Sequence, residues 1–88
     1  MELHEELAKL SETLKQQRDE IRLQLHLAGA DLKDEWEESE REWGHFKDKF
    51  AEIVDESKET STELLEKTRI VGEELKIAYK NIQRRLSS

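Results

Sequence analysis

Residues 31–56 have the sequence DLKDEWEESEREWGHFKDKFAEIVDE, and the spacing of their apolar side chains decides the fold class. The large apolar residues recur at steps of three, four or seven positions: Leu32, Trp36, Trp43, Phe46, Phe50 and Ile53. Such steps place side chains on one face of an α-helix, because the helix repeats every ~3.6 residues. The segment therefore predicts an amphipathic helix whose aromatic stripe packs against other helices.

The same stripe continues in both directions along the chain. With the polar gaps filled at the same pitch, the mean step stays at about 3.6 residues, and no segment alternates as a strand does. We therefore expect an all-α protein built as a long antiparallel helical hairpin or coiled coil, with a three-helix bundle or a dimeric bundle as variants. The further members of the stripe are Leu3, Leu7, Leu10, Leu14, Ile21, Leu25, Ala28, Leu64, Val71, Leu75, Ala78, Ile82 and Leu86.

Composition limits what such a chain can be. Its 88 residues suffice for one domain, and 42% of them are charged, with no Pro and no Cys. A domain this short buries little surface, and without Cys it has neither disulfides nor thiolate metal ligands to strengthen it, so oligomerisation is the remaining means. The net charge of −7 disfavours nucleic acid as a partner, because phosphate contacts need a basic surface.

Two segments can interrupt the helix. In residues 28–31, AGAD, Gly29 suits the position after a helix end and Asp31 suits the cap of a new helix. In residues 57–62, SKETST, the stripe positions fall on Ser and Thr, and Thr60 with Glu63 fits a capping box. A single domain over residues 1–88 would then consist of an arm, 1–28, and an antiparallel pair, 31–56 and 61–86.

Charge favours a chain reversal within residues 57–61. Residues 31–56 carry a net charge of −7 and residues 57–88 a net charge of +2. Exposed ion pairs add little stability, but together they select the antiparallel register. The basic residues expected to face the acidic helix are Lys76, Lys80, Arg84 and Arg85.

The hairpin also predicts specific neighbours in the core. Trp43 should lie against Leu75, and Phe46 should lie on Gly72, where the missing side chain leaves room for a ring. A single continuous helix is the alternative, because the stripe keeps its phase through both candidate breaks.

The arm, residues 1–28, has a narrow Leu seam that suits contact with one other helix. A lone hairpin cannot cover this seam. We therefore predict a homo-oligomer, with a dimer favoured, and the alternative is that another protein covers the seam. The arm could instead fold back at Gly29, with Leu10 near Phe50 and Leu14 near Phe46. The expected interaction surface comprises Leu3, Leu7, Leu10, Leu14, Ile21, Leu25, Trp36, Trp43, Phe46 and Phe50.

Catalytic chemistry has little support in this sequence. Glu42 and His45 have the Glu-x-x-His spacing of di-iron bundles, but those sites need a second such motif and two further Glu. We interpret the pair as a solvated helix edge and the metal-binding bundle as a remote alternative. No nucleophile constellation or glycine-rich phosphate loop is evident, so we expect no enzyme and no cofactor.

Residues 69–85 give an alternative to a protein-binding role. Ile70, Val71, Ile77, Tyr79 and Ile82 oppose Arg and Lys side chains, a pattern that suits a helix lying on an anionic membrane surface. The simpler interpretation is the basic partner of the acidic helix. No apolar stretch is long enough to span a bilayer, and the start of the chain lacks the features of a secretory signal, so a cytoplasmic location is expected.

The runs DEWEESEREWGHFKDKF (34–50) and GEELKIAYKNIQRRL (72–86) resemble small uncharacterised bacterial coiled-coil proteins. These proteins share a Trp–acidic–Trp helix followed by a basic terminal helix. The resemblance covers roughly the last 55 residues and implies a helical fold without a known activity. The secreted WXG-type helical hairpins are similar in length and also have a central Trp, but here Trp43 and Gly44 are adjacent, without the spacer residue. We therefore predict a non-catalytic structural or interaction module that acts by self-association or by binding a partner helix.

Overall fold

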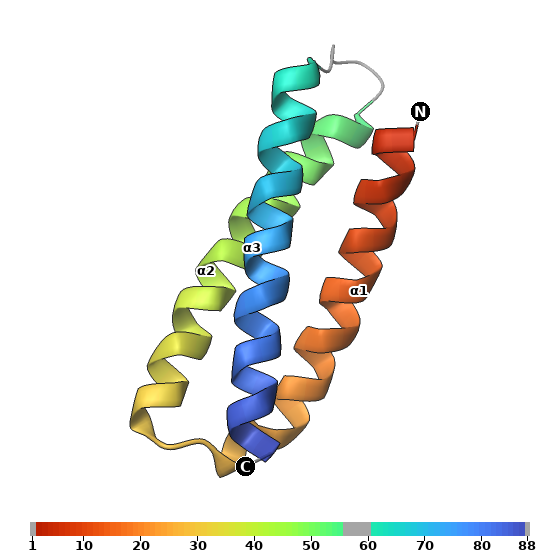
Figure 1. Cartoon of the computed structure of the whole chain (residues 1–88). Coiled ribbons are helices and arrows are strands. Elements are labelled where there is room, and N and C mark those ends of the chain that lie inside the picture. The colour runs from red at the N-terminus through yellow and green to blue at the C-terminus, as the bar shows by residue number, and fades with distance from the viewer. Residues whose placement is uncertain (1, 56–60, 88) are drawn as a thin grey trace.

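A computed structural model describes the backbone of residues 2–55 and 61–87, and the side chains of residues 5–55 and 61–87. It contains helix α1 (Glu2–Gln24), a 3-10 turn η1 (Leu25–Leu27), helix α2 (Ala30–Val54) and helix α3 (Thr62–Ser87). Figure 1 shows α1 and α3 running in the same direction and α2 running opposite to both. The described residues contain no strand, so the all-α prediction is confirmed, and the architecture is a helical bundle.

Helix α3 is the centre of the bundle. It packs along both α1 and α2, whereas the backbones of α1 and α2 approach each other less closely (Figure 1). The alternative of one continuous helix is wrong, because α2 and α3 lie side by side and run in opposite directions. The arm also folds back, and its seam packs mainly on α3.

The apolar stripe forms the core along the length of the bundle. Burying each of these large side chains contributes about 1.5–3 kcal/mol relative to leaving it in water. The stripe thus explains why three helices with so many charged residues pack together at all. The buried members are Leu7, Leu10, Leu14 and Ile21 from α1, Leu32, Trp36, Trp43, Phe46 and Ile53 from α2, and Leu75, Tyr79 and Ile82 from α3.

Gly72 is a point of close contact among the three helices. A Cβ atom placed on Gly72 would lie 2.5 Å from Cδ2 of Leu10 and 2.8 Å from Cε1 of Phe46. The predicted approach of Phe46 to Gly72 is therefore confirmed. Leu10 meets the same point, so it lies at the level of Phe46, whose ring stacks on that of Phe50, the neighbour that the sequence suggested for Leu10.

The helix ends differ in detail from the predicted ones. Gly29 has φ −77° and ψ 177° and precedes the first turn of α2, so it is the N-cap of α2 and does not take the left-handed conformation expected after a helix end. Asp31 lies inside the first turn. At the start of α3 the Oγ atom of Ser61 accepts a hydrogen bond from the N–H of Leu64 at 3.1 Å. The predicted Thr60 cap and most of the 57–61 reversal fall on residues outside the described ranges.

A polar layer crosses the middle of the bundle. The guanidinium of Arg18 in α1 donates two hydrogen bonds to the carboxylate of Glu40 in α2, at 2.6 and 2.8 Å, and lies 5.8 Å from the centre of the Trp43 ring. The hydrogen bond to Glu40 raises the pKa of Arg18. Bidentate pairs of this kind fix geometry as well as charge, so this pair sets how α1 sits against α2.

Tyr79 reaches the same layer from α3 and is fully buried against Trp36, with ring centres 5.9 Å apart. Its hydroxyl, like the side-chain oxygen of Gln17, is buried without a hydrogen-bond partner among the described residues. Burial raises the pKa of Tyr79, and the negative charge of Glu40 raises it further, although Arg18 acts in the opposite direction.

We expect Tyr79→Phe to leave the free energy of unfolding at neutral pH unchanged or to raise it by about 1 kcal/mol, because a buried, unpaired hydroxyl is costly. The pKa of Tyr79 is higher in the folded than in the unfolded chain, so its ionisation does not affect the free energy of unfolding below the ordinary tyrosine pKa of about 10. Above this value the unfolded chain loses its tyrosine proton first, and the free energy of unfolding of the wild type falls as pH rises. Urea unfolding of both proteins across this range should show the extra loss only in the wild type. An equal pH dependence in the variant would contradict the buried position of the hydroxyl.

Candidate functional site: the groove between α2 and α3

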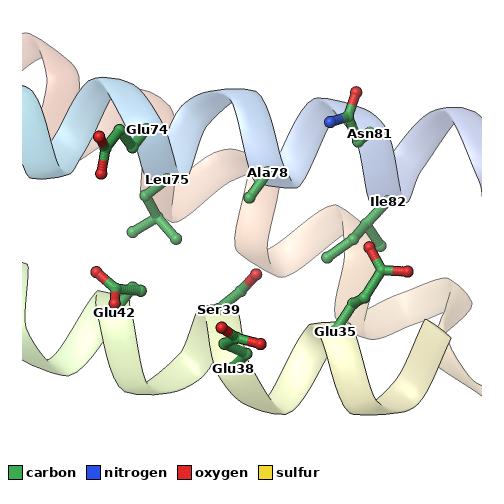
Figure 2. A pocket seen from close by; sticks show the side chains of 9 residues that line it. All are labelled: Glu35, Glu38, Ser39, Glu42, Glu74, Leu75, Ala78, Asn81 and Ile82. Carbon is green, nitrogen blue, oxygen red and sulfur yellow. The ribbon is translucent and has the colours of Figure 1, made fainter. Parts of the chain in front are cut away.

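An open groove of about 320 Å³ lies between α2 and α3. Figure 2 shows it from the side on which α1 lies behind the two helices. Its volume is at the lower end for ligand sites, and it is bounded by helix sides and not by loops. The lining residues are Glu35, Glu38, Ser39 and Glu42 from α2, and Glu74, Leu75, Ala78, Asn81 and Ile82 from α3.

The groove exists because small residues occupy the middle of both walls. In α2, Ser39 takes the stripe position between Trp36 and Trp43, and in α3, Ala78 lies next to the buried Leu75 and Ile82. Neither small side chain fills the space between the helices that large neighbours fill above and below. The floor is therefore mainly apolar, with one hydroxyl group in it.

Ser39 is a buried polar residue, only 5% exposed. Figure 2 shows its hydroxyl directed across the groove toward α3. The hydroxyls of Thr68 and Ser87 donate to the carbonyl four residues earlier, at 2.8 and 2.9 Å, but within residues 5–55 and 61–87 Ser39 makes no such bond. The buried side-chain oxygens without a partner in these ranges belong to Gln17 and Tyr79, so the Ser39 hydroxyl reaches solvent at the groove and is open to a molecule bound there.

The walls of the groove carry negative charge, and most of it has no ion-pair partner within residues 5–55 and 61–87. Glu35 is paired with Arg85 at one end. Among the described residues Glu38, Glu42 and Glu74 form no ion pair. In Figure 2, Glu42 and Glu74 extend from opposite helices at the other end of the groove.

The predicted charge pairing between α2 and α3 is thus largely wrong. Of the four basic residues expected to face the acidic helix, Arg85 is the one that forms an ion pair with α2 in the described part of the chain. Lys76 instead lines a hollow between α1 and α3 that includes Glu6, and Lys80 and Arg84 are exposed. The core fixes how α3 is rotated, because burying apolar side chains outweighs weak surface ion pairs.

A partly apolar stripe of α3 lies beside the groove. Ile70 is 50% exposed and Ile77 is 59% exposed. Together with the groove residues Glu74 and Asn81 they are spaced at 70, 74, 77 and 81, which places them on one continuous side of the helix. The floor of the groove and this stripe form one surface, which we call the α2–α3 face.

The residues predicted to form an interaction surface lie mostly in the interior of the chain. The arm residues are covered by α3 of the same molecule, and the aromatic block is core. In the folded chain this set is therefore not an exposed surface. Leu7, Leu10, Leu14, Ile21, Trp36, Trp43 and Phe46 are buried, and Leu25 and Phe50 are partly buried, while the side chain of Leu3 falls outside the described residues.

The remote metal site finds no support in the geometry. Glu42 and His45 are both exposed. Over the described residues, no three His, Cys, Asp or Glu side chains converge closely enough to hold a metal ion. Nor is any helix in the described part of the chain long and apolar enough to cross a membrane.

Comparison of the chain with protein-family models, with curated proteins and with solved structures gives no match. The likeness of residues 34–50 and 72–86 to bacterial coiled-coil proteins therefore stays a prediction. The function has to be inferred from the geometry of the α2–α3 face.

Proposed function

We propose that this chain is a non-catalytic helical interaction module that binds a helix of a partner protein on its α2–α3 face. The observation that carries the proposal is the groove itself, which is open on the side away from α1 and lined by an apolar floor and unpaired carboxylates. Its long walls are two antiparallel helices, so a third helix laid between them would pack as in a four-helix bundle.

The sequence predicted two modes of interaction, self-association and binding of a partner helix. The Leu seam that suggested a dimer is covered by α3, so a partner helix on the α2–α3 face now has the stronger support. Two copies joined face to face would also bring their carboxylates together, which costs free energy. The cytoplasm remains the location that we propose for the module.

Binding to an anionic membrane surface is less well supported by α3. Of the five apolar residues named for the membrane pattern, Tyr79 and Ile82 are buried in the core. The exposed Ile70 and Ile77 share their side of the helix with Glu74, and a carboxylate at that place is repelled by anionic lipid.

A photoreactive side chain can test the proposed function. Placed at Asn81, on the rim of the groove, it should form a discrete cross-linked adduct with a partner protein in cells that make this chain naturally. Placed at the exposed Glu37, which does not line the groove, it should not. Equal adducts from both positions would contradict the α2–α3 face as the binding surface, and an adduct of twice the chain mass would indicate self-association.

A further inference from the structure

We infer that the partner helix is basic and amphipathic, with apolar side chains on the floor of the groove and lysine or arginine side chains against its walls. This inference rests on the proposed function and specifies the chemistry of the partner. It combines three features of the α2–α3 face: carboxylates that form no ion pair among the described residues, the spread of these carboxylates along the walls beside the Ser39 hydroxyl, and exposed isoleucines.

The first feature is charge on both walls. Glu38 and Glu42 from α2 and Glu74 from α3 line the groove without a cationic partner in the described part of the chain. Glu38 and Glu42 are four residues apart, about 6 Å along the helix axis at ~1.5 Å per residue. A partner helix lying along α2 can match them with two basic residues that are also one turn apart.

The second feature is that these carboxylates do not converge. No group of three potential ligands close enough for a metal ion occurs among the described residues. A point charge such as a divalent cation is therefore a poor match for this arrangement, whereas cations spread along a helix can meet each carboxylate separately. The hydroxyl of Ser39 lies between them and can accept a hydrogen bond from a lysine ammonium or an arginine N–H.

The third feature is apolar. Leu75, Ala78 and Ile82 contribute the floor, and Ile70 and Ile77 continue the apolar area along the outer side of α3. A small organic polycation could occupy the groove but would leave the two isoleucines in water. A helix with an apolar stripe covers both, which is why we commit to a helix as the occupant.

The test uses synthetic helical peptides and the full chain. The first peptide has three heptads, with leucine at the two apolar positions and lysine at the flanking positions. The second has glutamate in place of each lysine, and spermidine serves as the small polycation. Calorimetric titration, with mapping of backbone amide shifts, should show the lysine peptide binding at Ser39, Ala78 and Asn81. Its affinity should fall as salt rises, because exposed charges are screened over about 8 Å at about 0.15 M salt.

A matched pair of variants locates the charge. We expect Glu38→Lys/Glu42→Lys to weaken binding of the lysine peptide by about tenfold or more, because two attractions become repulsions. Glu37→Lys/Asp48→Lys changes the net charge equally on the same helix, but neither residue lines the groove, so it should weaken binding by less than about threefold. Ile77→Ala should also weaken binding, whereas Leu23→Ala, on α1, should not.

The possible outcomes separate the inference from the proposed function. If the glutamate peptide binds the α2–α3 face as tightly as the lysine peptide, the basic partner is wrong and the helix-binding module stands. If spermidine binds there and neither peptide does, the ligand is a small polycation. The basic partner helix and the helix-binding module are then both wrong. If no probe shifts the groove residues, both are wrong as well. Equal losses of affinity for the lysine peptide in the two double variants would mean that the net charge of the chain controls binding, whatever the position of the charges. This result would also overturn the inference.

Discussion

Trp43→Ala is expected to destabilise the chain by about 3–5 kcal/mol, the range found when a large aromatic residue is removed from a core. Trp43 is 6% exposed, and its ring stacks on that of Phe46 with an interplanar angle of 20° and centres 5.9 Å apart. It also lies under Arg18, whose distance from the ring centre is 5.8 Å. The loss would be comparable to the total stability of many domains, so a largely unfolded chain at room temperature is the expected result.

Urea unfolding followed by circular dichroism measures this loss. The control is Leu23→Ala, which truncates an apolar side chain that is 77% exposed and should change the free energy of unfolding by less than about 0.5 kcal/mol. If Trp43→Ala costs no more than Leu23→Ala, the aromatic stripe of α2 faces solvent, and α2 does not pack in a three-helix bundle.

Gly72→Leu is expected to have the second large effect, a loss of about 1–3 kcal/mol or more from overpacking. Even a Cβ atom at this position would lie 2.5 Å from Leu10 and 2.8 Å from the ring of Phe46, so a whole leucine side chain must separate the helices. The gain in helix propensity of about 1 kcal/mol offsets a part of this cost.

Gly44→Leu is the matched control for Gly72→Leu. A Cβ atom on Gly44 meets nothing within 4 Å, so the same change in the middle of α2 should stabilise the chain by about 0.5–1 kcal/mol. Combining Gly72→Leu with Leu10→Ala should cost less than the sum of the two single changes, because the second creates room for the first. Strict additivity would mean that Leu10 and Gly72 are not neighbours.

The sequence predicts the helices and much of the core. The 3.6-residue period identifies the buried face of each helix, since Leu7, Trp43 and Ile82 all lie on it and all are buried. The antiparallel pairing of Phe46 with Gly72 follows from the same pattern, because a ring needs space and glycine supplies it. These features depend on local spacing and size, which a single sequence contains.

The position of the arm does not follow from the sequence. A seam such as Leu7, Leu10 and Leu14 buries the same area against α3 of its own chain as against another copy, so its pattern is compatible with both. The prediction that the basic residues of α3 face the acidic helix α2 was largely wrong for a related reason. Lys76 and Lys80 follow the rotation of α3, and that rotation is set by the core and not by surface charge.

The α2–α3 face could have been found in part. Ser39 and Ala78 are small residues at facing positions of two otherwise bulky stripes, and they indicate a gap once the register is known. Ile70 and Ile77 lie off the main stripe at a spacing of seven, which indicates a second apolar side of α3. What the sequence cannot show is which carboxylates remain unpaired, because that depends on the three-dimensional course of long side chains.

The central claim is that α1 is covered by α3 of the same chain, which leaves the α2–α3 face as the surface open to a partner. The most direct measurement is an isotope-filtered nuclear Overhauser experiment on a mixture of labelled and unlabelled chains. We predict a contact between the methyl groups of Leu10 and the Hα atoms of Gly72 in a fully labelled sample, and no such contact in the filtered spectrum, which reports only pairs from different molecules. A Leu10–Gly72 contact in the filtered spectrum would show that the arm pairs with another copy, and would contradict the claim.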